Sequence, residues 1–160
     1  MFEVGDKIVY PMHGAGTIVA VEEKEILGQK KKYLIMEMPI GDMDISIPVD
    51  NIESIGIRDV FDKEDLDEVI RVLEGDLSKM SDNWSRRYRE NLDKIRTGDI
   101  LEVAAVVRNL TIRDEEKGLS TGEKKMLNSA MKMLVSELII VNGKTKEETE
   151  KLIEDSIINS

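Results

Sequence analysis

The spacing of apolar residues changes near residue 60, where short alternating runs give way to a helical repeat. Before that point, β-branched or alternating segments occur over residues 7–10, 16–21, 33–38 and 44–48. All 3 prolines and six of the 11 glycines separate or flank these segments. Short runs bounded in this way are typical of antiparallel strands, and Leu27-Gly28-Gln29 suits a hairpin tip. We therefore predict a Tudor-like or SH3-like antiparallel β barrel, or a half-open sheet, over residues 1–58.

Beyond residue 58, apolar residues recur every three or four positions, which indicates amphipathic helices rather than strands. Capping residues and glycines divide this part into five predicted helices: Asp62 to Gly75, Asn83 to Arg96, Asp99 to Gly118, Ser120 to Asn142, and Thr145 onward. Ser120 with Glu123, and Thr145 with Glu148, have the spacing of a capping box. The pattern predicts an α+β fold in which a compact all-α domain over residues 59–160 follows the β domain.

The side-chain chemistry of the 160 residues is narrow, because the chain has no cysteine and a single histidine. The lack of cysteine excludes a disulfide scaffold, a thiolate zinc site and a cysteine nucleophile. His13 lies beside glycines in a predicted turn, with no second histidine to complete a catalytic or metal site. Asp42 and Asp44 are interpreted as solvated hairpin carboxylates rather than metal ligands. We predict a non-enzymatic protein with no cofactor and no metal.

No apolar run approaches the roughly 18 residues that a membrane-spanning helix needs. No signal peptide precedes Met1. We therefore expect a soluble, cytoplasmic protein without a membrane partner.

Charge is distributed unevenly along a chain whose formal net charge is −10. Residues 1–79 contain nine basic and 18 acidic side chains, whereas the remainder contains 14 basic and 15 acidic ones. Within residues 84–113, seven basic side chains, six of them arginine, outnumber four acidic ones. Such arginines often pair with nearby acids on a helix, but they also bind phosphate well. The net charge argues against strong non-specific DNA binding by the free protein without excluding DNA as a partner.

The only tryptophan lies in the segment Asn83-Trp84-Ser85-Arg86-Arg87-Tyr88-Arg89, among three arginines. On a helix, Trp84 shares a stripe with Tyr88, Leu92 and Ile95, so it could begin the buried core face. Alternatively, Trp84 is exposed near a helix N-terminus and acts as a wedge against distorted DNA, with arginines on the phosphates. Part of that charge could be neutralised internally, because Arg86 precedes Glu90 by four residues. The pattern alone leaves both interpretations open.

Four blocks of sequence carry a family resemblance that extends over essentially the whole chain. They are Val4-Gly5-Asp6-Lys7-Ile8-Val9-Tyr10-Pro11 with His13-Gly14, then Gly56-Ile57-Arg58-Asp59-Val60, Asn83-Trp84-Ser85-Arg86-Arg87-Tyr88, and Arg113-Asp114 with Lys117-Gly118-Leu119-Ser120 and Gly122-Glu123-Lys124. In this order the blocks resemble the CarD/CdnL family of bacterial regulators that bind RNA polymerase.

The resemblance implies a Tudor-like N-terminal domain, similar to the polymerase-interacting domain of the transcription-repair coupling factor. In the family this domain docks on the β subunit of RNA polymerase, partly by pairing strand edges. The implied polymerase contacts in this chain are Lys24, Ser46, Ile47 and Pro48. Two of these positions depart from the family, since Lys24 and Ser46 stand where some members carry arginine.

The resemblance further implies that the helical domain reaches the minor groove of promoter DNA at the upstream edge of the transcription bubble. There the tryptophan that matches Trp84 acts as a wedge, which slows bubble collapse and stabilises the open complex. The implied DNA contacts in this chain are Trp84, Arg86, Arg87, Arg89, Lys124 and Lys125.

Two functional hypotheses follow from the sequence and the resemblance together. The first is a monomeric transcription regulator that docks on polymerase, associates with the nucleoid through it and stabilises the open promoter. The second is a polymerase-bound adaptor whose helical domain binds another protein, with Trp84 buried in the core. The exposure of Trp84 distinguishes the two.

Overall fold

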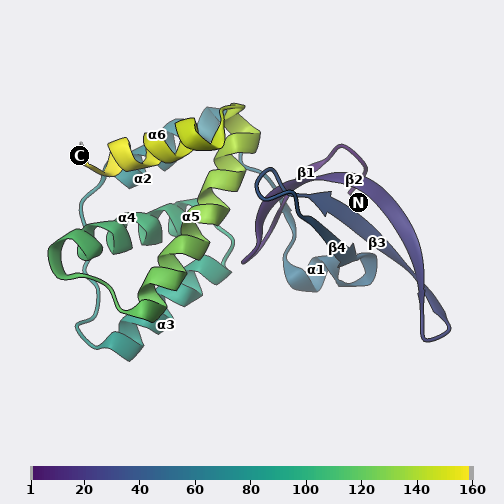
Figure 1. Cartoon of the computed structure of the whole chain (residues 1–160), viewed down its shortest axis with the longest axis horizontal. Helices are drawn as coiled ribbons and strands as arrows, with labels where there is room; N and C mark the ends of the chain where they lie inside the picture. Colours follow the sequence, from purple (N-terminus) through teal and green to yellow (C-terminus); the bar gives the residue numbers. More distant parts are fainter. Residues whose placement is uncertain (1, 159–160) are drawn as a thin grey trace.

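The computed structural model describes residues 2–158, in which an antiparallel sheet is followed by a helical domain (Figure 1). The strands are β1 (Lys7–Tyr10), β2 (Gly14–Ile26), β3 (Gln29–Glu37), β4 (Asp44–Pro48) and β5 (Arg58–Asp59), with a one-turn helix α1 (Ile52–Ile55) before β5. Their order across the sheet is β4-β3-β2-β1-β5, so β4 and β5 are its two edges. The predicted α+β fold, with a small antiparallel β domain before the helices, is confirmed, and the sheet is open between β4 and β5, which do not pair.

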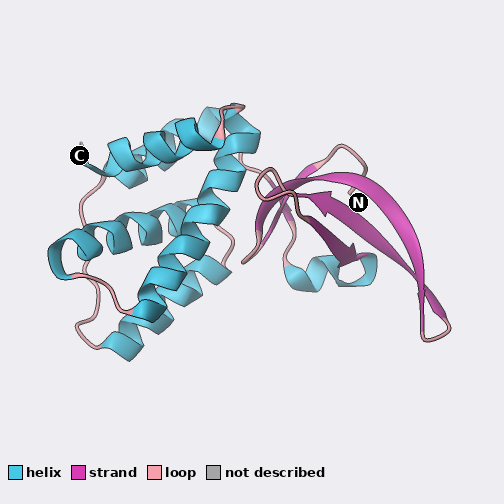
Figure 2. Cartoon of the chain, in the orientation of Figure 1, coloured by secondary structure: helices cyan, strands magenta, loops and turns pink. Residues whose placement is uncertain are grey.

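The β2–β3 hairpin extends well past the rest of the sheet (Figure 2). Leu27 and Gly28 at its tip have φ angles of 52° and 79°, the left-handed conformations that a tight two-residue hairpin turn requires. Along the hairpin, Glu25 lies opposite Lys30 and thus places opposite charges side by side. At its base, the sheet packs on a small core whose fully buried members are Ile8, Ile18, Met36 and Ile47. The outer part of the hairpin is therefore an exposed, charged ribbon.

Five helices form the second domain, as the sequence predicted, within the described residues 2–158. They are α2 (Leu66–Glu74), α3 (Trp84–Arg96), α4 (Ile100–Lys117), α5 (Thr121–Asn142) and α6 (Lys146–Ile158). The core lies largely between α4 and α5, where Val107, Leu110 and Leu134 are fully buried. Burial of these apolar side chains is the main force that holds the helices together.

Four of the five predicted helix starts are capped by the expected residue, namely Asn83, Asp99, Ser120 and Thr145, and one differs. Ser120 and Glu123 form the expected capping box, and Thr145 and Glu148 exchange the same pair of hydrogen bonds at 3.2 and 3.1 Å. The expectation that Asp62 caps the first helix is wrong. A short 3₁₀ turn over Lys63–Asp65 precedes α2, and the Asp62 side chain makes no capping hydrogen bond.

The end of α2 and the segment that follows it are tied to α4 by hydrogen bonds. The guanidinium of Arg108 on α4 donates to the carbonyl oxygen of Val72 at 2.8 Å and to the hydroxyl of Ser78 at 2.7 Å. The neighbouring Asn109 accepts a hydrogen bond from the backbone N–H of Ser78 at 3.1 Å. Although burial lowers the pKa of Arg108, its hydrogen bonds explain why a charged side chain is tolerated there.

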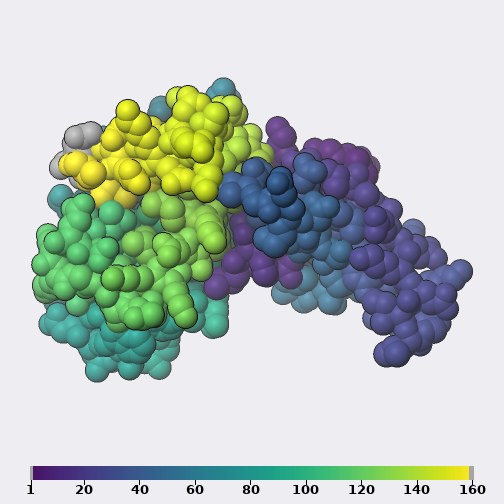
Figure 3. Space-filling model, viewed as in Figure 1, coloured from purple at the N-terminus to yellow at the C-terminus, as the bar shows by residue number. Residues whose placement is uncertain are grey.

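The two domains are joined by polar contacts of the β5 region and the start of β2 with α5, and Figure 3 shows their surfaces in contact. Arg58 of β5 donates to both carboxylate oxygens of Glu137 on α5 at 2.8 Å each, and the backbone N–H of Phe61 donates to the same carboxylate at 2.9 Å. The backbone N–H of Ala15 donates to Ser136 at 2.9 Å. Gly14 is required beside it, because a Cβ there would lie 2.6 Å from the Ser136 hydroxyl. β5 thus links the sheet to the helical domain.

Candidate nucleic-acid interface

Trp84 is the first residue of α3, and this position decides its exposure. Asn83 caps the helix, with its side-chain oxygen accepting a hydrogen bond from the backbone N–H of Arg86 at 3.0 Å. Because no helical turn precedes Trp84, its side chain lies at the end of the helix and remains 45% exposed. The buried residues of α3 lie further along the helix and are Arg87, Asn91 and Ile95. The interpretation of Trp84 as a buried core residue is therefore wrong.

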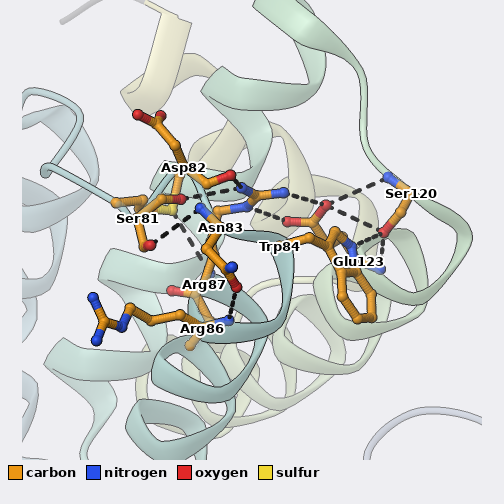
Figure 4. Close-up of polar contacts among 10 residues, drawn as sticks. Ser81, Asp82, Asn83, Trp84, Arg86, Arg87, Ser120 and Glu123 are labelled. Atoms are coloured by element: carbon orange, nitrogen blue, oxygen red, sulfur yellow. Dashed lines mark hydrogen bonds and ion pairs between the residues drawn. The ribbon is translucent and has the colours of Figure 1, made fainter.

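The indole of Trp84 is held in place by contacts with α3 and with the start of α5, where its N–H meets Ser120 (Figure 4). Its ring stacks on Tyr88 with a centroid separation of 5.2 Å and an interplanar angle of 22°. Its Nε1–H donates to the hydroxyl of Ser120 at 2.8 Å. Gly122 lies beneath both rings, since a Cβ at this position would be 3.5 Å from Trp84 and 3.6 Å from Tyr88. With its only donor already used, the exposed part of the indole is apolar, which suits stacking or wedging rather than hydrogen bonding to a base.

Arg87, also on α3, forms a buried ion pair with Glu123 of α5. The guanidinium donates to the two carboxylate oxygens at 2.8 and 3.1 Å, and only 4% of Arg87 and 2% of Glu123 are exposed. These hydrogen bonds hold the pKa of the Glu123 carboxyl below its usual value and raise the pKa of Arg87. A further bond from Arg87 to the carbonyl oxygen of Ser81, at 3.1 Å, uses another of its donors. Arg87 has no donor exposed for DNA, so the expected contact is replaced by a structural role.

The other basic residues expected at DNA are exposed. Arg86 and Arg89 lie on the first two turns of α3, and Lys124 and Lys125 lie on the first turn of α5. The ring of Trp84 contacts this same turn of α5 through Ser120 and Gly122. Among the described residues, Arg86 forms no ion pair with Glu90. The N-terminal ends of α3 and α5 therefore bring together the apolar ring of Trp84 and four exposed cationic side chains. The two helix ends are far apart in sequence, since Trp84 and Ser120 are separated by 36 residues.

The residues expected to contact polymerase lie at the β4 side of the sheet. Lys24 of β2 donates to the hydroxyl of Ser46 of β4 at 3.2 Å, and its ammonium group lies 5.3 Å from the ring centroid of Tyr33. β4 pairs with β3 alone and forms a sheet edge. The side chain of Ile47 is fully buried in the sheet core, so a contact there would have to use its backbone. Ser46 is exposed and Pro48 is partly exposed.

Sequence reasoning identified Ser120 and Glu123 as helix-capping residues but missed their contacts with Trp84 and Arg87. A periodicity signal was present for Arg87, which precedes Asn91 and Ile95 at four-residue intervals on the buried face of α3.

Among residues 2–158, no helix is long and apolar enough to span a membrane. Within the same residues, no group of three or more histidine and carboxylate side chains is placed to hold a metal ion.

Comparison with known proteins gives matches over both domains. The family model described as "CarD-like/TRCF RID domain" matches residues 2–61, and the one described as "CarD, C-terminal domain" matches residues 68–154. A protein of Bacillus subtilis (strain 168) named "Putative transcription factor YdeB" is 45% identical over 148 residues, which is 92% of this chain and 97% of that protein.

Proposed function

The chain belongs to the CarD/CdnL family, and we propose that it docks on the β subunit of RNA polymerase and stabilises the promoter open complex. The family consists of transcription factors and is not known for enzymes, in agreement with the predicted non-enzymatic role. In this proposal Trp84 acts at the upstream edge of the bubble, in the minor groove of the promoter. One chain carries both surfaces, so we propose that it works as a monomer in the cytoplasm, associated with the nucleoid through polymerase.

The observation that carries the proposal is the half-exposed ring of Trp84 beside exposed cationic side chains. Its N–H is satisfied within the protein and its exposed side is apolar, so it could insert beside unstacked bases without losing a hydrogen bond. Arg86, Arg89, Lys124 and Lys125 would contact the flanking phosphates, which carry no sequence information. This combination favours recognition of a distorted duplex rather than of a particular base sequence.

Stabilisation of the open complex follows if the wedge binds open DNA better than closed DNA. A ligand shifts such an equilibrium only by its differential affinity for the two states. A difference of about 1.4 kcal/mol changes the open-to-closed ratio tenfold. Docking on polymerase raises the local concentration of promoter DNA, which allows a chain of net charge −10 to act on DNA that it binds weakly when free.

Trp84→Ala is expected to shorten the lifetime of the open complex on the order of tenfold, corresponding to about 1.4 kcal/mol, because the wedge is removed. Polymerase binding should be unchanged, since Trp84 lies outside the β domain. The lifetime is measured by challenging preformed complexes with a competitor. Leu77→Ala, which removes another partly exposed apolar side chain of the helical domain, is the control and should leave the lifetime unaltered. An unchanged lifetime with folded Trp84→Ala would refute the wedge.

Docking is proposed at the β4 edge, where unpaired backbone groups could extend a strand of the partner. Lys24→Glu should weaken binding to polymerase, because it reverses the charge beside Ser46. Lys30→Glu is the matched control: Lys30 pairs with Glu25 on the opposite face of the same hairpin. Binding of the full-length variants to immobilised polymerase decides between them. Equal weakening by both substitutions would count against this docking face.

A further inference from the structure

We propose that Ser120 is a positioning residue for Trp84, and that Glu123 and Arg87 hold Ser120 in place for this role. The proposal rests on the proposed function of Trp84 at the promoter and adds how its ring is oriented. The four residues come from two helices: Trp84 and Arg87 belong to α3, while Ser120 and Glu123 belong to the N-terminal end of α5. Their side chains form a continuous chain of hydrogen bonds (Figure 4).

The hydroxyl of Ser120 is fully engaged. It accepts from the indole Nε1–H of Trp84 at 2.8 Å and from the backbone N–H of Glu123 at 3.2 Å, and it donates to the Glu123 carboxylate at 3.2 Å. A serine hydroxyl has one donor and two acceptor positions, so all three are occupied. Its direction is therefore fixed by Glu123, and it offers the indole an acceptor in one place only.

Glu123 is in turn fixed from the other side by Arg87. Two charge-assisted hydrogen bonds in a buried site hold the carboxylate, and Arg87 is itself tied to the carbonyl oxygen of Ser81 just before α3. The chain of contacts thus returns to the residues that precede Trp84. This series of hydrogen bonds begins at Trp84 and ends at Ser81, and both residues lie where α3 begins. The position of the Trp84 ring is therefore linked to the packing of α3 against α5.

This arrangement matters for a wedge because Trp84 is at a helix end and half exposed. Without the bond to Ser120, the ring would sample more side-chain conformations and would have to be ordered when it meets DNA. Ordering one such side chain on binding corresponds to roughly a two- to tenfold loss in the equilibrium. We therefore expect the effect of losing Ser120 to be a fraction of the effect of losing Trp84 itself.

Substitutions of Ser120, with a control at Thr145, test whether Ser120 positions the Trp84 ring. Ser120→Ala removes the acceptor of the indole together with the cap of α5, whereas Ser120→Gly removes the hydroxyl but retains a residue type that caps helices well. Ser120→Thr restores the hydroxyl. Thr145→Ala is the matched control, because it removes the hydroxyl of the equivalent capping box on α6, which accepts from the backbone N–H of Glu148.

Two readouts are used on each full-length variant. Trp84 is the only tryptophan, so the anisotropy and acrylamide quenching of intrinsic fluorescence report on its ring alone. Open-complex lifetime with polymerase and promoter reports on function. Ser120→Ala and Ser120→Gly should lower the anisotropy, increase quenching and shorten the lifetime roughly two- to tenfold. Ser120→Thr should resemble the unmodified protein in both measurements, and Thr145→Ala should alter neither.

Unchanged fluorescence in Ser120→Gly would overturn the proposal, as would a more mobile ring with an unaltered lifetime. An equal shortening by Thr145→Ala would also overturn it, because loss of stability would then explain the result. If Ser120→Ala fails to fold, Ser120→Gly decides. Failure of the proposed function is separately visible: Trp84→Ala would leave the lifetime unchanged, whatever the fluorescence of the Ser120 variants shows.

Discussion

Glu123→Ala should lower the free energy of unfolding by about 3–5 kcal/mol, the range measured when one partner of a buried ion pair is removed. The substitution leaves Arg87, which is 4% exposed, as a buried charge without its carboxylate partner. The backbone carbonyls of Ser81 and Asp82 then remain as its hydrogen-bond acceptors. The substitution also removes the carboxylate that accepts from the Ser120 hydroxyl. Urea unfolding followed by far-UV circular dichroism measures the change.

Glu148→Ala is the matched control, because Glu148 occupies the same position in the capping box of α6 but is exposed and has no arginine partner. A similar loss of stability in both variants would show that capping, rather than the ion pair, accounts for the effect.

The loss of stability caused by Glu123→Ala should also depend on pH. The pKa of Glu123 is lowered in the folded state, so its contribution is complete above the ordinary glutamate pKa of about 4.3 and is lost as the pH falls through the lower folded value. The difference between the unmodified protein and Glu123→Ala should therefore narrow in strong acid.

The same residues show how far sequence could predict this site. The Ser120 and Glu123 spacing predicts a capping box from local hydrogen bonding alone, and the structure contains it. The arginine cluster around Trp84 predicts a positive helix start, but its members differ: Arg86 and Arg89 are exposed, whereas Arg87 points into the core. Helical periodicity distinguishes the buried Arg87 from the exposed Arg86 and Arg89 only if the polar residue Asn91, four positions after Arg87, is known to be buried.

Contacts between distant segments were beyond prediction because no local pattern encodes them. The bond from Trp84 to Ser120 joins residues 36 apart, and the pair of Arg58 with Glu137 joins residues 79 apart. Each depends on how helices and sheet pack after their local structure has formed. A helical glutamate such as Glu137 reads in sequence as a solvated surface residue, yet it is only 2% exposed.

Glu137→Ala is expected to separate the proposed docking on polymerase from the proposed action on DNA. The Glu137 carboxylate accepts three hydrogen bonds from residues of the β5 region, two from Arg58 and one from the backbone N–H of Phe61. Its loss should cost about 1–3 kcal/mol, because the orphaned donors must find other partners. The value is below that for Glu123, since the Arg58 side chain is 30% exposed and water can solvate it.

We expect the effect on function to exceed the effect on stability, because these bonds help to hold β5 against α5 and thereby the β4 edge relative to Trp84. We expect the Glu137→Ala variant to bind polymerase normally through Lys24 and the β4 edge. The open-complex lifetime should nevertheless be shorter, because Trp84 is no longer held at a fixed position relative to the docked β domain. Small-angle X-ray scattering should show a broader distance distribution in the variant. Glu150→Ala, which breaks the exposed pair with Lys146, is the control and should change neither quantity. If Glu137→Ala loosens the two domains but the lifetime is retained, the wedge does not depend on a fixed domain arrangement, and local anchoring of the ring by α5 is sufficient.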